Sequence, residues 1–483
     1  VANPNGVTCA GCATVNSPRF MLSTGTPVWL DALGSPASFA GATGVGFDVI
    51  GGQVRVEGQG LEGTVGKVEL VGASIQLDGP VRAPSLTPGL AGTPWRAGAG
   101  RVAERAGQPD NLPPAPPAAM PLGSFAIDGT AFGAMSSSQI RIVSTDQGFG
   151  VRMAGPLLAD SQGLVVRSAG DLSVGELVAR QSITLDAAGN LNMRGATASG
   201  GDLSVHAGGR VSVNAASSVT GAASLSAADT VEILAPLTVG GRASVSADQV
   251  RLAAGVTAGE TQLDARSLAL GDGGRDVQIR GDLNLAVTGD LTTPGAVSVS
   301  GNTRLAASGS VGLGGDVTVG GNLSVDAVAD IHATGRLTAG GLMHLHAGQA
   351  LNIADGVSAG APDLVAGRGV FGGGVGGRGG GRGGSIVAGS LVLPDRMEAG
   401  GSLRIDTVGD LLNTGRVVAN GDLSLSAGGR LALAEGGAGG RADLTARGGV
   451  LSIGNPFVAG ENVAPGGGGG GGEAGGAAGG GGG

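Results

Sequence analysis

Apolar and polar residues alternate in short bursts that recur along most of the chain. In one such unit the apolar positions are Leu203 and Val205, then Val211 and Val213, then Val219. An alternation with a period of two is typical of strands that bury one face and expose the other. Three bursts separated by glycine-rich pairs therefore predict three short strands and three turns in each unit.

Glycine marks these units at a regular spacing. Steps of 20 from position 201 to position 421 meet Gly at ten of twelve positions, whereas chance at this glycine content would give about two or three. The ten are residues 201, 221, 241, 281, 301, 321, 341, 381, 401 and 421. We interpret them as turn residues that tolerate a positive φ. Thr261 and Ala361 interrupt the series, so the units around them are expected to be irregular and the first places to seek function.

A strand of three to five residues cannot bury its own apolar face, so each unit must wind into a triangular coil and stack on its neighbours. The sequence therefore predicts an all-β fold, a right-handed parallel β-helix (solenoid) with about 20 residues per coil. Val, Leu, Ile and Ala would face the core, and the alternate polar residues would face water. In this register Leu323 and Ile331 are buried, and His332 is exposed.

Composition separates a varied N-terminal part from uniform repeats. Aromatic residues make up 2% of the chain, and both Trp and six of the eight Phe lie in the first 150 residues. We predict an N-terminal domain at 1–107, a Pro-rich loop or linker at 108–121, a repeat shaft at 122–465 with a Gly/Arg-rich loop insertion at 367–384, and a disordered poly-Gly tail at 466–483.

Charge and hydropathy exclude some classes of partner. The net charge is −9 and no basic stripe occurs, so we expect no capture of nucleic acid or anionic lipid. No apolar run approaches the length of a membrane span, about 18 residues or more, so no transmembrane segment is predicted. The start at Val1-Ala2-Asn3-Pro4, with no charged and apolar leader, is expected of a mature or truncated fragment.

The histidines offer the first candidate site. His344 and His346 would share one strand face, an arrangement that can bind a metal ion. No carboxylate is expected in a matching column, so we predict a solvated pair and no metal site.

A β-helix can also carry a polysaccharide lyase or glycosidase site, which needs carboxylates that converge on one outer sheet. The acidic residues instead recur at two offsets just after glycine, namely Asp202, Asp282 and Asp422, and Asp290, Asp330 and Asp410. Turn chemistry explains Asp there, so we predict no catalytic residues. The Gly-rich strings of 372–384 resemble phosphate loops, but no helical pattern follows, and no cofactor is expected.

The N-terminal string Asn3-Pro4-Asn5-Gly6 is followed by Cys9 and Cys12. It resembles the second Asn-Pro-Asn motif in the secretion domain of two-partner secreted exoproteins, the filamentous haemagglutinin and haemolysin family. The likeness continues through 22–27 and through 126–152, and the later repeats are similar to the shaft of the family. Val7 stands where Ile is usual, and the earlier Asn-Pro-Asn motif of the family is missing.

The resemblance implies a secreted β-helical exoprotein that is threaded unfolded through a dedicated outer-membrane transporter. The transporter would recognise the N-terminal domain, of which 1–107 would be the C-terminal part. By position, Asn3 and Asn5 would carry the role of the motif in export.

Cys9 and Cys12 have three interpretations. A disulfide that closes a short loop is favoured because an exported protein crosses an oxidising periplasm. Zinc would require two further ligands, and no second Cys pair exists. A redox pair would require a helix N-terminus, whereas Gly11 and the preceding motif indicate turns.

The leading hypothesis for function is a non-enzymatic adhesin shaft, secreted and displayed at the bacterial cell surface, that attaches to host-cell glycans, receptors or matrix or to other bacteria. Weak contacts repeated along a solenoid can add through effective concentration. The alternatives are the shaft of a haemolysin or contact-dependent toxin whose effector lies outside this sequence, and a polysaccharide-active β-helix enzyme.

Overall fold

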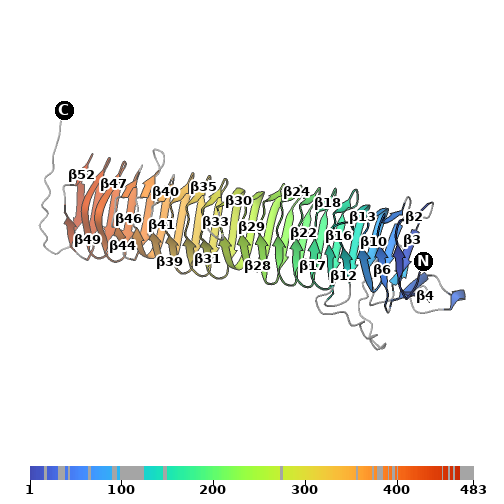
Figure 1. The fold of residues 1–483 in the computed structure, drawn as a ribbon. Helices are drawn as coiled ribbons and strands as arrows, with labels where there is room; N and C mark the ends of the chain where they lie inside the picture. The colour runs from blue at the N-terminus through green and yellow to red at the C-terminus, as the bar shows by residue number, and fades with distance from the viewer. Residues whose placement is uncertain are drawn as a thin grey trace. The chain divides into compact units, whose positions relative to one another are not determined.

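The computed structural model divides the chain into two compact units, Val1–Gly241 (unit 1) and Arg242–Gly483 (unit 2). Both consist of strands wound into stacked coils (Figure 1). Among the described residues the only helical element is the 3-10 turn η1 (Phe39–Gly41). The described residues are 1–15, 19–30, 38–41, 44–49, 51–63, 67–89, 95–97, 125–144, 149–271, 276–354, 357–359, 361–371, 375–377, 384–389, 391–393, 397–399, 401–448, 450–454, 457–460 and 463–467.

The strands are short and follow one another in three-part groups. Those of unit 1 are β1 Val7–Cys9, β2 Cys12–Thr14, β3 Arg19–Ser23, β4 Thr26–Leu30, β5 Gly44–Asp48, β6 Gln53–Val56, β7 Leu61–Gly63, β8 Lys67–Val71, β9 Ser74–Leu77, β10 Val81–Gly89, β11 Trp95–Ala97, β12 Phe125–Gly129, β13 Met135–Ser144, β14 Gly150–Met153, β15 Leu157–Ala159, β16 Leu164–Ser168, β17 Leu172–Val174, β18 Leu177–Ala179, β19 Ile183–Ala187, β20 Leu191–Met193, β21 Thr197–Ser199, β22 Leu203–Ala207, β23 Val211–Val213, β24 Ser217–Val219, β25 Ala223–Ala227, β26 Thr230–Ile233 and β27 Leu237–Val239. Those of unit 2 are β28 Arg242–Leu252, β29 Val256–Leu270, β30 Val277–Val287, β31 Leu291–Thr293, β32 Val297–Val299, β33 Thr303–Ala307, β34 Val311–Leu313, β35 Val317–Val319, β36 Leu323–Ala327, β37 Ile331–Ala333, β38 Leu337–Ala339, β39 Leu342–Ile353, β40 Val357–Ala359, β41 Ala361–Phe371, β42 Val375–Gly377, β43 Gly384–Ala388, β44 Leu391–Leu393, β45 Met397–Ala399, β46 Leu403–Thr407, β47 Leu411–Ala419, β48 Leu423–Ala427, β49 Leu431–Ala438, β50 Ala442–Ala446, β51 Leu451–Ile453, β52 Val458–Ala459 and β53 Val463–Gly467.

Each coil contributes one strand to each of three parallel ladders. In unit 1, β22 pairs with β19 and β25, so Leu203 lies between Ile183 and Ala223, the equivalent residues of the preceding and following coils. β23 pairs in the same way with β20 and β26, and β24 pairs with β21 and β27. Unit 2 repeats this pattern, for example in β33, β34 and β35. The right-handed parallel β-helix predicted from the sequence is confirmed.

The core of each coil is built by alternation within its strands. Leu203, Val205 and Ala207 of β22 are at most 1% exposed, whereas Ser204 and His206 between them face water. In unit 2, Leu323 and Ile331 are buried and His332 is exposed, as the sequence predicts. The register is thus fixed by which residues are apolar, because a shift of one residue would expose all of them.

Three N-terminal aromatic residues, Trp29, Phe47 and Trp95, belong to a second, smaller sheet in unit 1. β5 is the central strand and pairs antiparallel with β4 and β11, which places Trp95 opposite Phe47. Trp29 meets Phe39 edge to face, with ring centroids 4.9 Å apart. Figure 1 shows β4 lying beside the first coils rather than within the parallel stack. This sheet accounts for part of the compositional difference between the N-terminal part and the repeats.

The repeated glycines have a different cause from the predicted one. The prediction that these glycines recur because they adopt a positive φ is wrong in general. Among the described glycines of the regularly spaced series, only Gly281 has a positive φ, at 110°. A Cβ at Gly321 would instead lie 2.5 Å from Oδ1 of Asn302, and one at Gly421 would lie 2.8 Å from Oγ of Ser402. Glycine is required because the preceding coil lies against the backbone at these positions.

The break in the glycine series at Thr261 is a change of coil length. Glu260 pairs with Arg242 of the preceding coil, which is a shorter step than usual, and with Asp282 of the following coil, which is a longer one. Thr261 therefore pairs with Leu283 and is buried in the core. The column position is residue 259, which is Gly. The expected substitution of the column glycine by Thr261 is wrong.

The break at Ala361 has the same origin. Ala361 pairs with Leu342, again a shorter step than usual, so the column position falls on 360. Residue 360 is Gly in the sequence and lies outside the described residues. Both irregularities are insertions or deletions in a coil, so counting at a strict interval mistakes them for lost glycines.

Strand structure continues into two segments that were predicted to lack it. β41 pairs with β39 as far as Phe371, and β42 pairs with β40 through Gly377. The prediction of a loop over 367–384 is therefore wrong for the part of β41 up to Phe371 and for β42. Residues 378–383 lie outside the described residues. β53 pairs with β50 through Gly467, two residues into the predicted tail, because ladder pairing requires only backbone groups. The remaining tail, 468–483, and the linker at 108–121 also lie outside the described residues.

Candidate functional site

The N-terminal motif forms a tight turn that leads into the first coil. The Oδ1 atom of Asn3 accepts a hydrogen bond of 3.1 Å from the backbone N–H of Asn5, and the carbonyl of Asn3 accepts one from the N–H of Gly6, also 3.1 Å. Gly6 has a φ of 128°, which favours glycine. Asn at the first position is suited to this turn because its side chain can hydrogen-bond the backbone two residues on.

The turn is held against the next coil while its side chains stay accessible. A Cβ at Gly52 would lie 2.5 Å from the carbonyl oxygen of Pro4, so only glycine permits this contact. Immediately after the turn, Val7 begins the pairing of β1 with β6. Asn3, Pro4 and Asn5 are all exposed. The motif is therefore an ordered turn that a second protein can contact.

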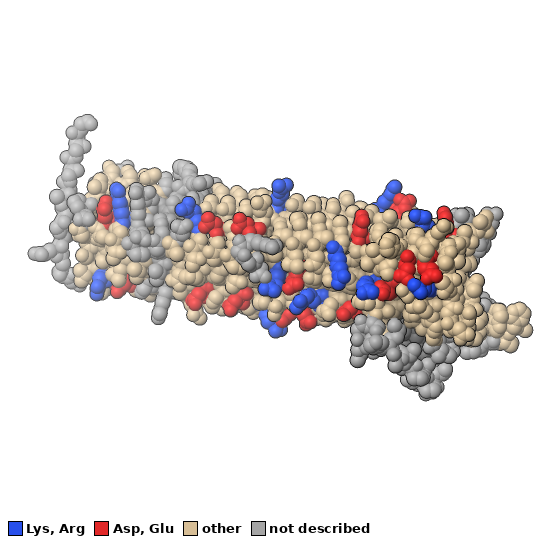
Figure 2. Space-filling model, viewed as in Figure 1, with Lys and Arg blue, Asp and Glu red and all other residues tan. Residues whose placement is uncertain are grey.

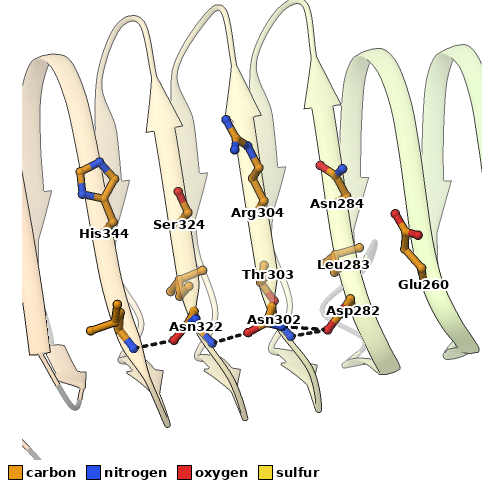
Figure 3. A pocket seen from close by; sticks show the side chains of 12 residues that line it. Glu260, Asp282, Leu283, Asn284, Asn302, Thr303, Arg304, Asn322, Ser324 and His344 are labelled. Atoms are coloured by element: carbon orange, nitrogen blue, oxygen red, sulfur yellow. Dashed lines mark hydrogen bonds between the residues drawn. The ribbon is translucent and has the colours of Figure 1, made fainter.

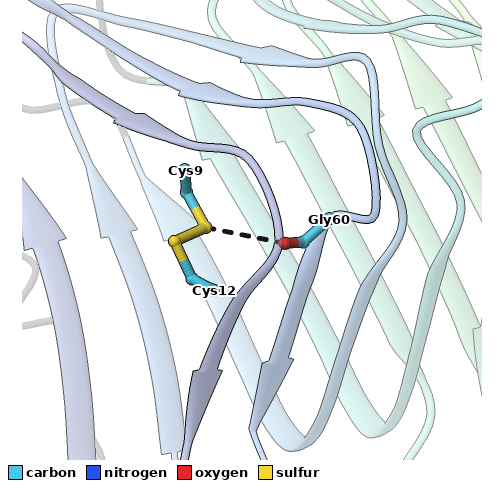
Figure 4. The surroundings of a disulfide bond; sticks show 3 residues. All are labelled: Cys9, Cys12 and Gly60. Atoms are coloured by element: carbon cyan, nitrogen blue, oxygen red, sulfur yellow. Dashed lines mark hydrogen bonds between the residues drawn. A yellow bond between two sulfur atoms is a disulfide. The ribbon is translucent and has the colours of Figure 1, made fainter.

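A disulfide joins Cys9 and Cys12 across the corner between β1 and β2, with their Cα atoms 5.6 Å apart. Figure 4 shows Cys9 Sγ directed at the carbonyl oxygen of Gly60, 3.6 Å away. The same carbonyl accepts hydrogen bonds from the backbone N–H groups of Gly11 and Cys12. Gly11 has a φ of 94° and makes the sharp bend. The crosslink thus closes the first corner of the β-helix.

We predict that mass spectrometry of the exported protein, alkylated under native and then denaturing conditions, finds neither Cys9 nor Cys12 free. The two Cα atoms already lie within bonding range, and Cys9 is 1% exposed, which protects it from reductants. Two alkylated thiols in the denatured, unreduced sample would contradict this prediction.

The segments around 126–152 meet in adjacent strands. Asp128 of β12 lies opposite Arg152 of β14, and the Oδ1 and Oδ2 atoms of Asp128 accept hydrogen bonds of 2.8 and 2.5 Å from Arg152. The guanidinium also stacks 4.8 Å from the centre of the Phe125 ring. The hydrogen bond to Asp128 raises the pKa of Arg152. Nearby, burial and secondarily the charge of Arg167 lower the pKa of Arg141.

A polar groove follows one outer face of unit 2 across several coils. Figure 3 shows Asn284, Arg304, Ser324 and His344 projecting side by side from successive strands, with Glu260 at one end. These side chains occupy equivalent register positions, one per coil. The groove therefore presents a repeating row of hydrogen-bonding groups.

Below this row, side-chain oxygens link each coil to the next. Oδ1 of Asp282 accepts a hydrogen bond of 2.7 Å from the backbone N–H of Asn302 (Figure 3). Oδ1 of Asn302 accepts one of 3.0 Å from the N–H of Asn322, and Oδ1 of Asn322 accepts one of 2.8 Å from the N–H of Leu342. We call this series the amide ladder. It supplies partners for backbone N–H groups that the strand ladders leave unpaired.

The recurrent acidic residues belong to such contacts. Each of Asp202, Asp282, Asp290, Asp330, Asp410 and Asp422 accepts a backbone N–H bond of 2.7–2.9 Å from a residue 19 or 20 positions later. The sequence-based explanation invoked bonds within one turn, but the observed bonds run between coils. These carboxylates therefore have a structural role, and they contribute to the need for glycine at the column positions.

The histidine pair differs from the prediction in one respect. Leu345 points into the core, and both His344 and His346 lie on the outer face, as expected. The expectation that no carboxylate occupies a matching column is wrong, because Asp326 lies opposite His346 and Asp363 lies opposite His344. A search at the regular interval from His346 finds Asp326, whereas Asp363 stands one position off that interval from His344 and is missed.

Exposed charges are interspersed with charges of the opposite sign. On the face drawn in Figure 2, acidic and basic side chains lie close together. Described pairs include Arg180 with Asp160 at 2.8 Å and Arg242 with Glu260 at 2.8 Å. Such exposed pairs add little stability, but they leave no basic stripe on that face. Within the described ranges, no helix has the length and apolar character needed to span a membrane.

Two family matches cover most of the described coils. Residues 1–174 match the TPS secretion domain, and residues 179–235, 257–316 and 312–357 match repeats of unknown function. The first match continues past residue 107, where the sequence-based division placed the end of the domain. It includes the N-terminal turn, the disulfide corner and the Asp128–Arg152 pair.

Curated relatives are similar to a part of the chain. Filamentous haemagglutinin of Bordetella pertussis is 36% identical over 205 residues, which is 42% of this chain and 5% of that protein. A tRNA nuclease CdiA of Yersinia mollaretii is 31% identical over 207 residues, 43% of this chain and 6% of that protein. A 16S rRNA endonuclease CdiA of Enterobacter cloacae is 34% identical over 206 residues, which is 42% of this chain and 6% of that protein. No solved structure matches the chain.

A β-helix that opens with a secretion domain defines an exported solenoid protein. With these matches, residues 1–174 form a secretion domain of the two-partner type, and the chain is similar to exoproteins of the filamentous haemagglutinin and CdiA type. Two-partner secretion exoproteins are secreted and displayed at the bacterial cell surface, and this chain has the same localisation. The chain spans only about a twentieth of the length of these relatives.

Proposed function

We propose that the Asn3–Gly6 turn is part of the surface by which an outer-membrane two-partner secretion transporter recognises this chain, and that the β-helix which follows is the shaft of an adhesin. The exposure of Asn3, Pro4 and Asn5 within the matched secretion domain supports the first part. The identity of 36% with filamentous haemagglutinin over 205 residues supports the second.

The role of the turn in export can be tested with Asn3→Ala in the full-length exoprotein, expressed with its transporter. Loss of one hydrogen bond within the turn costs about 1 kcal/mol, which lowers the equilibrium constant for the ordered turn about fivefold. We expect the amount of protein secreted to fall, by at most about fivefold, as measured by immunoblot of the medium and cell surface.

Two further variants test whether export depends on the hydrogen bond within the turn. Asn3→Asp keeps a side-chain acceptor and should retain most of the export, whereas Thr8→Ala, on an exposed neighbouring position, should leave it unchanged. Normal export of Asn3→Ala would exclude the turn as a recognition element.

The adhesin proposal assigns attachment to the outer faces of the shaft. The groove row of Asn284, Arg304 and Ser324 offers donors and acceptors that match glycan hydroxyls, repeated once per coil. Host-cell glycans, receptors or matrix are the ligands for which such a surface is suited. Weak contacts repeated in this way gain strength through effective concentration.

Cell attachment tests this proposal directly. Purified chain immobilised on beads should attach to epithelial cells or to a glycan array, and Arg304→Ala combined with Asn284→Ala should reduce the attachment. The matched control is Ser218→Ala with Thr238→Ala, which changes exposed polar residues of unit 1 outside the groove. Absence of attachment by the unaltered chain would count against the adhesin proposal.

A toxin-delivery shaft is the second candidate, and the similarity to proteins named tRNA nuclease and 16S rRNA endonuclease favours it. In that case the full-length exoprotein should inhibit or lyse neighbouring cells, whereas the present chain should only attach. We assign no enzymatic activity, no cofactor and no nucleic-acid partner to the present chain. Robust cleavage of pectin, hyaluronan or a related polymer by the purified chain would overturn that assignment.

A further inference from the structure

Four ionisable side chains gather on one outer face of unit 2. They are Asp326 on β36, His344 and His346 on β39, and Asp363 on β41. These strands are neighbours in one parallel ladder, and the register places Asp326 opposite His346 and His344 opposite Asp363. We call these four residues the His/Asp cluster. Figure 3 shows its member His344 standing on the groove face beside Ser324.

One carboxylate oxygen lies between the two imidazoles. Oδ1 of Asp326 is 3.9 Å from Nε2 of His344 and 3.8 Å from Nδ1 of His346. The side chains of Asp326, His344 and His346 are 34%, 42% and 50% exposed, so each can rotate and each can be reached from solvent. Three potential metal-ligand atoms thus lie on one accessible face of adjacent coils, with Oδ1 of Asp326 within 4 Å of both nitrogens.

Asp363 orients one of these donors. Its Oδ2 atom lies 3.0 Å from Nδ1 of His344. An ionised carboxylate can only accept, so Nδ1 carries a proton, and in the neutral imidazole Nε2, 3.9 Å from Oδ1 of Asp326, keeps the lone pair. A carboxylate that accepts from the second ring nitrogen is the usual companion of a metal-binding histidine, because it fixes the ring and its tautomer.

The distances between the donor atoms are close to those found around a bound divalent ion. Metal–nitrogen and metal–oxygen bonds of about 2.0–2.2 Å in a tetrahedral site place the donor atoms about 3.3 Å apart. The two separations at Asp326 exceed this by about half an ångström. No three His, Cys, Asp or Glu side chains among the described residues are already gathered at ligand distance. The imidazole rings of His344 and His346 have centroids 6.3 Å apart, so both side chains must rotate toward Asp326 to bring the donor atoms to ligand distance.

We propose that the His/Asp cluster binds one divalent transition-metal ion of the Zn²⁺ or Ni²⁺ class. Nε2 of His344, Nδ1 of His346 and Oδ1 of Asp326 are the protein ligands, water completes the coordination, and Asp363 is a positioning residue. Imidazole nitrogen with carboxylate oxygen is a donor set suited to these ions. The bound ion crosslinks β36 to β39 from outside, which adds a clip between two coils that otherwise associate through strand pairing and core packing.

Calorimetric titration of the full chain with ZnCl₂, and separately with NiCl₂, tests the proposal. We expect one cluster-dependent site per chain, lost or weakened at least tenfold in His344→Gln and in His346→Gln. Asp363→Asn should weaken binding by about 10- to 100-fold while leaving the stoichiometry unchanged, as expected of a residue that orients a ligand. His332→Gln, an exposed histidine outside the cluster, is the matched control and should bind as the unaltered chain does.

A thermal readout guards against misfolded variants. Saturating Zn²⁺ should raise the melting midpoint of the unaltered chain and of His332→Gln, but not that of His344→Gln, while circular dichroism without metal should be the same for all three. Equal Zn²⁺ binding by the unaltered chain and His344→Gln, or no binding by the unaltered chain, would overturn the proposal.

Discussion

Ile331→Ala is expected to lower the free energy of unfolding by about 2–5 kcal/mol. Ile331 is fully buried in β37, where it lies between Val311 and Leu351 of the adjoining coils. Truncation removes its apolar contacts and leaves a cavity that the stacked coils above and below cannot close. Urea denaturation of the full chain, followed by circular dichroism, measures the loss.

The adjacent residue supplies the matched control. His332 is next in the same strand but faces solvent, so His332→Ala should change the unfolding free energy by no more than about 0.5 kcal/mol. Leu323→Ala, at the corresponding buried position of β36, should behave like Ile331→Ala. Comparable losses at Ile331 and His332 would show that the assigned register is incorrect.

Gly321→Ala should destabilise the fold by about 1–3 kcal/mol, the usual cost of inserting an atom into a closely packed site. The new Cβ would lie 2.5 Å from Oδ1 of Asn302 and 2.9 Å from the carbonyl oxygen of Gly301. Relief of this clash requires Asn302 to move, which also breaks its hydrogen bond to the N–H of Asn322. The same urea denaturation measures the effect.

Gly312 is the control for this substitution. It lies in β34, and an added Cβ would meet nothing closer than 3.8 Å. Gly312→Ala should therefore be neutral, or stabilising by a few tenths of a kcal/mol because it restricts the unfolded chain. If the two alanine variants have the same stability, close packing between coils is not the reason for the glycine column.

The fold was predictable because two periodicities coincide in the sequence. Alternation within each burst identifies which residues face the core, and the recurrence of the bursts identifies the coil. Burial of Leu323 and exposure of His332 followed from these patterns alone. Coils that are shorter or longer than the usual length broke a strict count, so Thr261 and Ala361 were misplaced although neither interrupts the underlying column.

The candidate sites were less predictable, because they depend on which residues of different coils lie side by side. Asp363 could not be matched to His344 until the pairing of β39 with β41 showed a step shorter than the usual interval. The bonding of Asp282 and Asn302 to the next coil required the hydrogen-bond geometry. For the N-terminal motif the sequence indicated a turn, and the structure added its hydrogen bonds and its exposure.

By itself, the sequence determined the class of fold and the core face of the repeat strands, because local alternation and spacing are written in linear order, and the resemblance of Asn3-Pro4-Asn5-Gly6 to a known motif pointed to the two-partner secretion family. Only the tertiary structure decided why glycine recurs, what the turn carboxylates bind and which side chains make up the His/Asp cluster. Those features arise between coils, where residues one coil apart in the sequence come within hydrogen-bonding distance, and their contacts depend on the length of each coil.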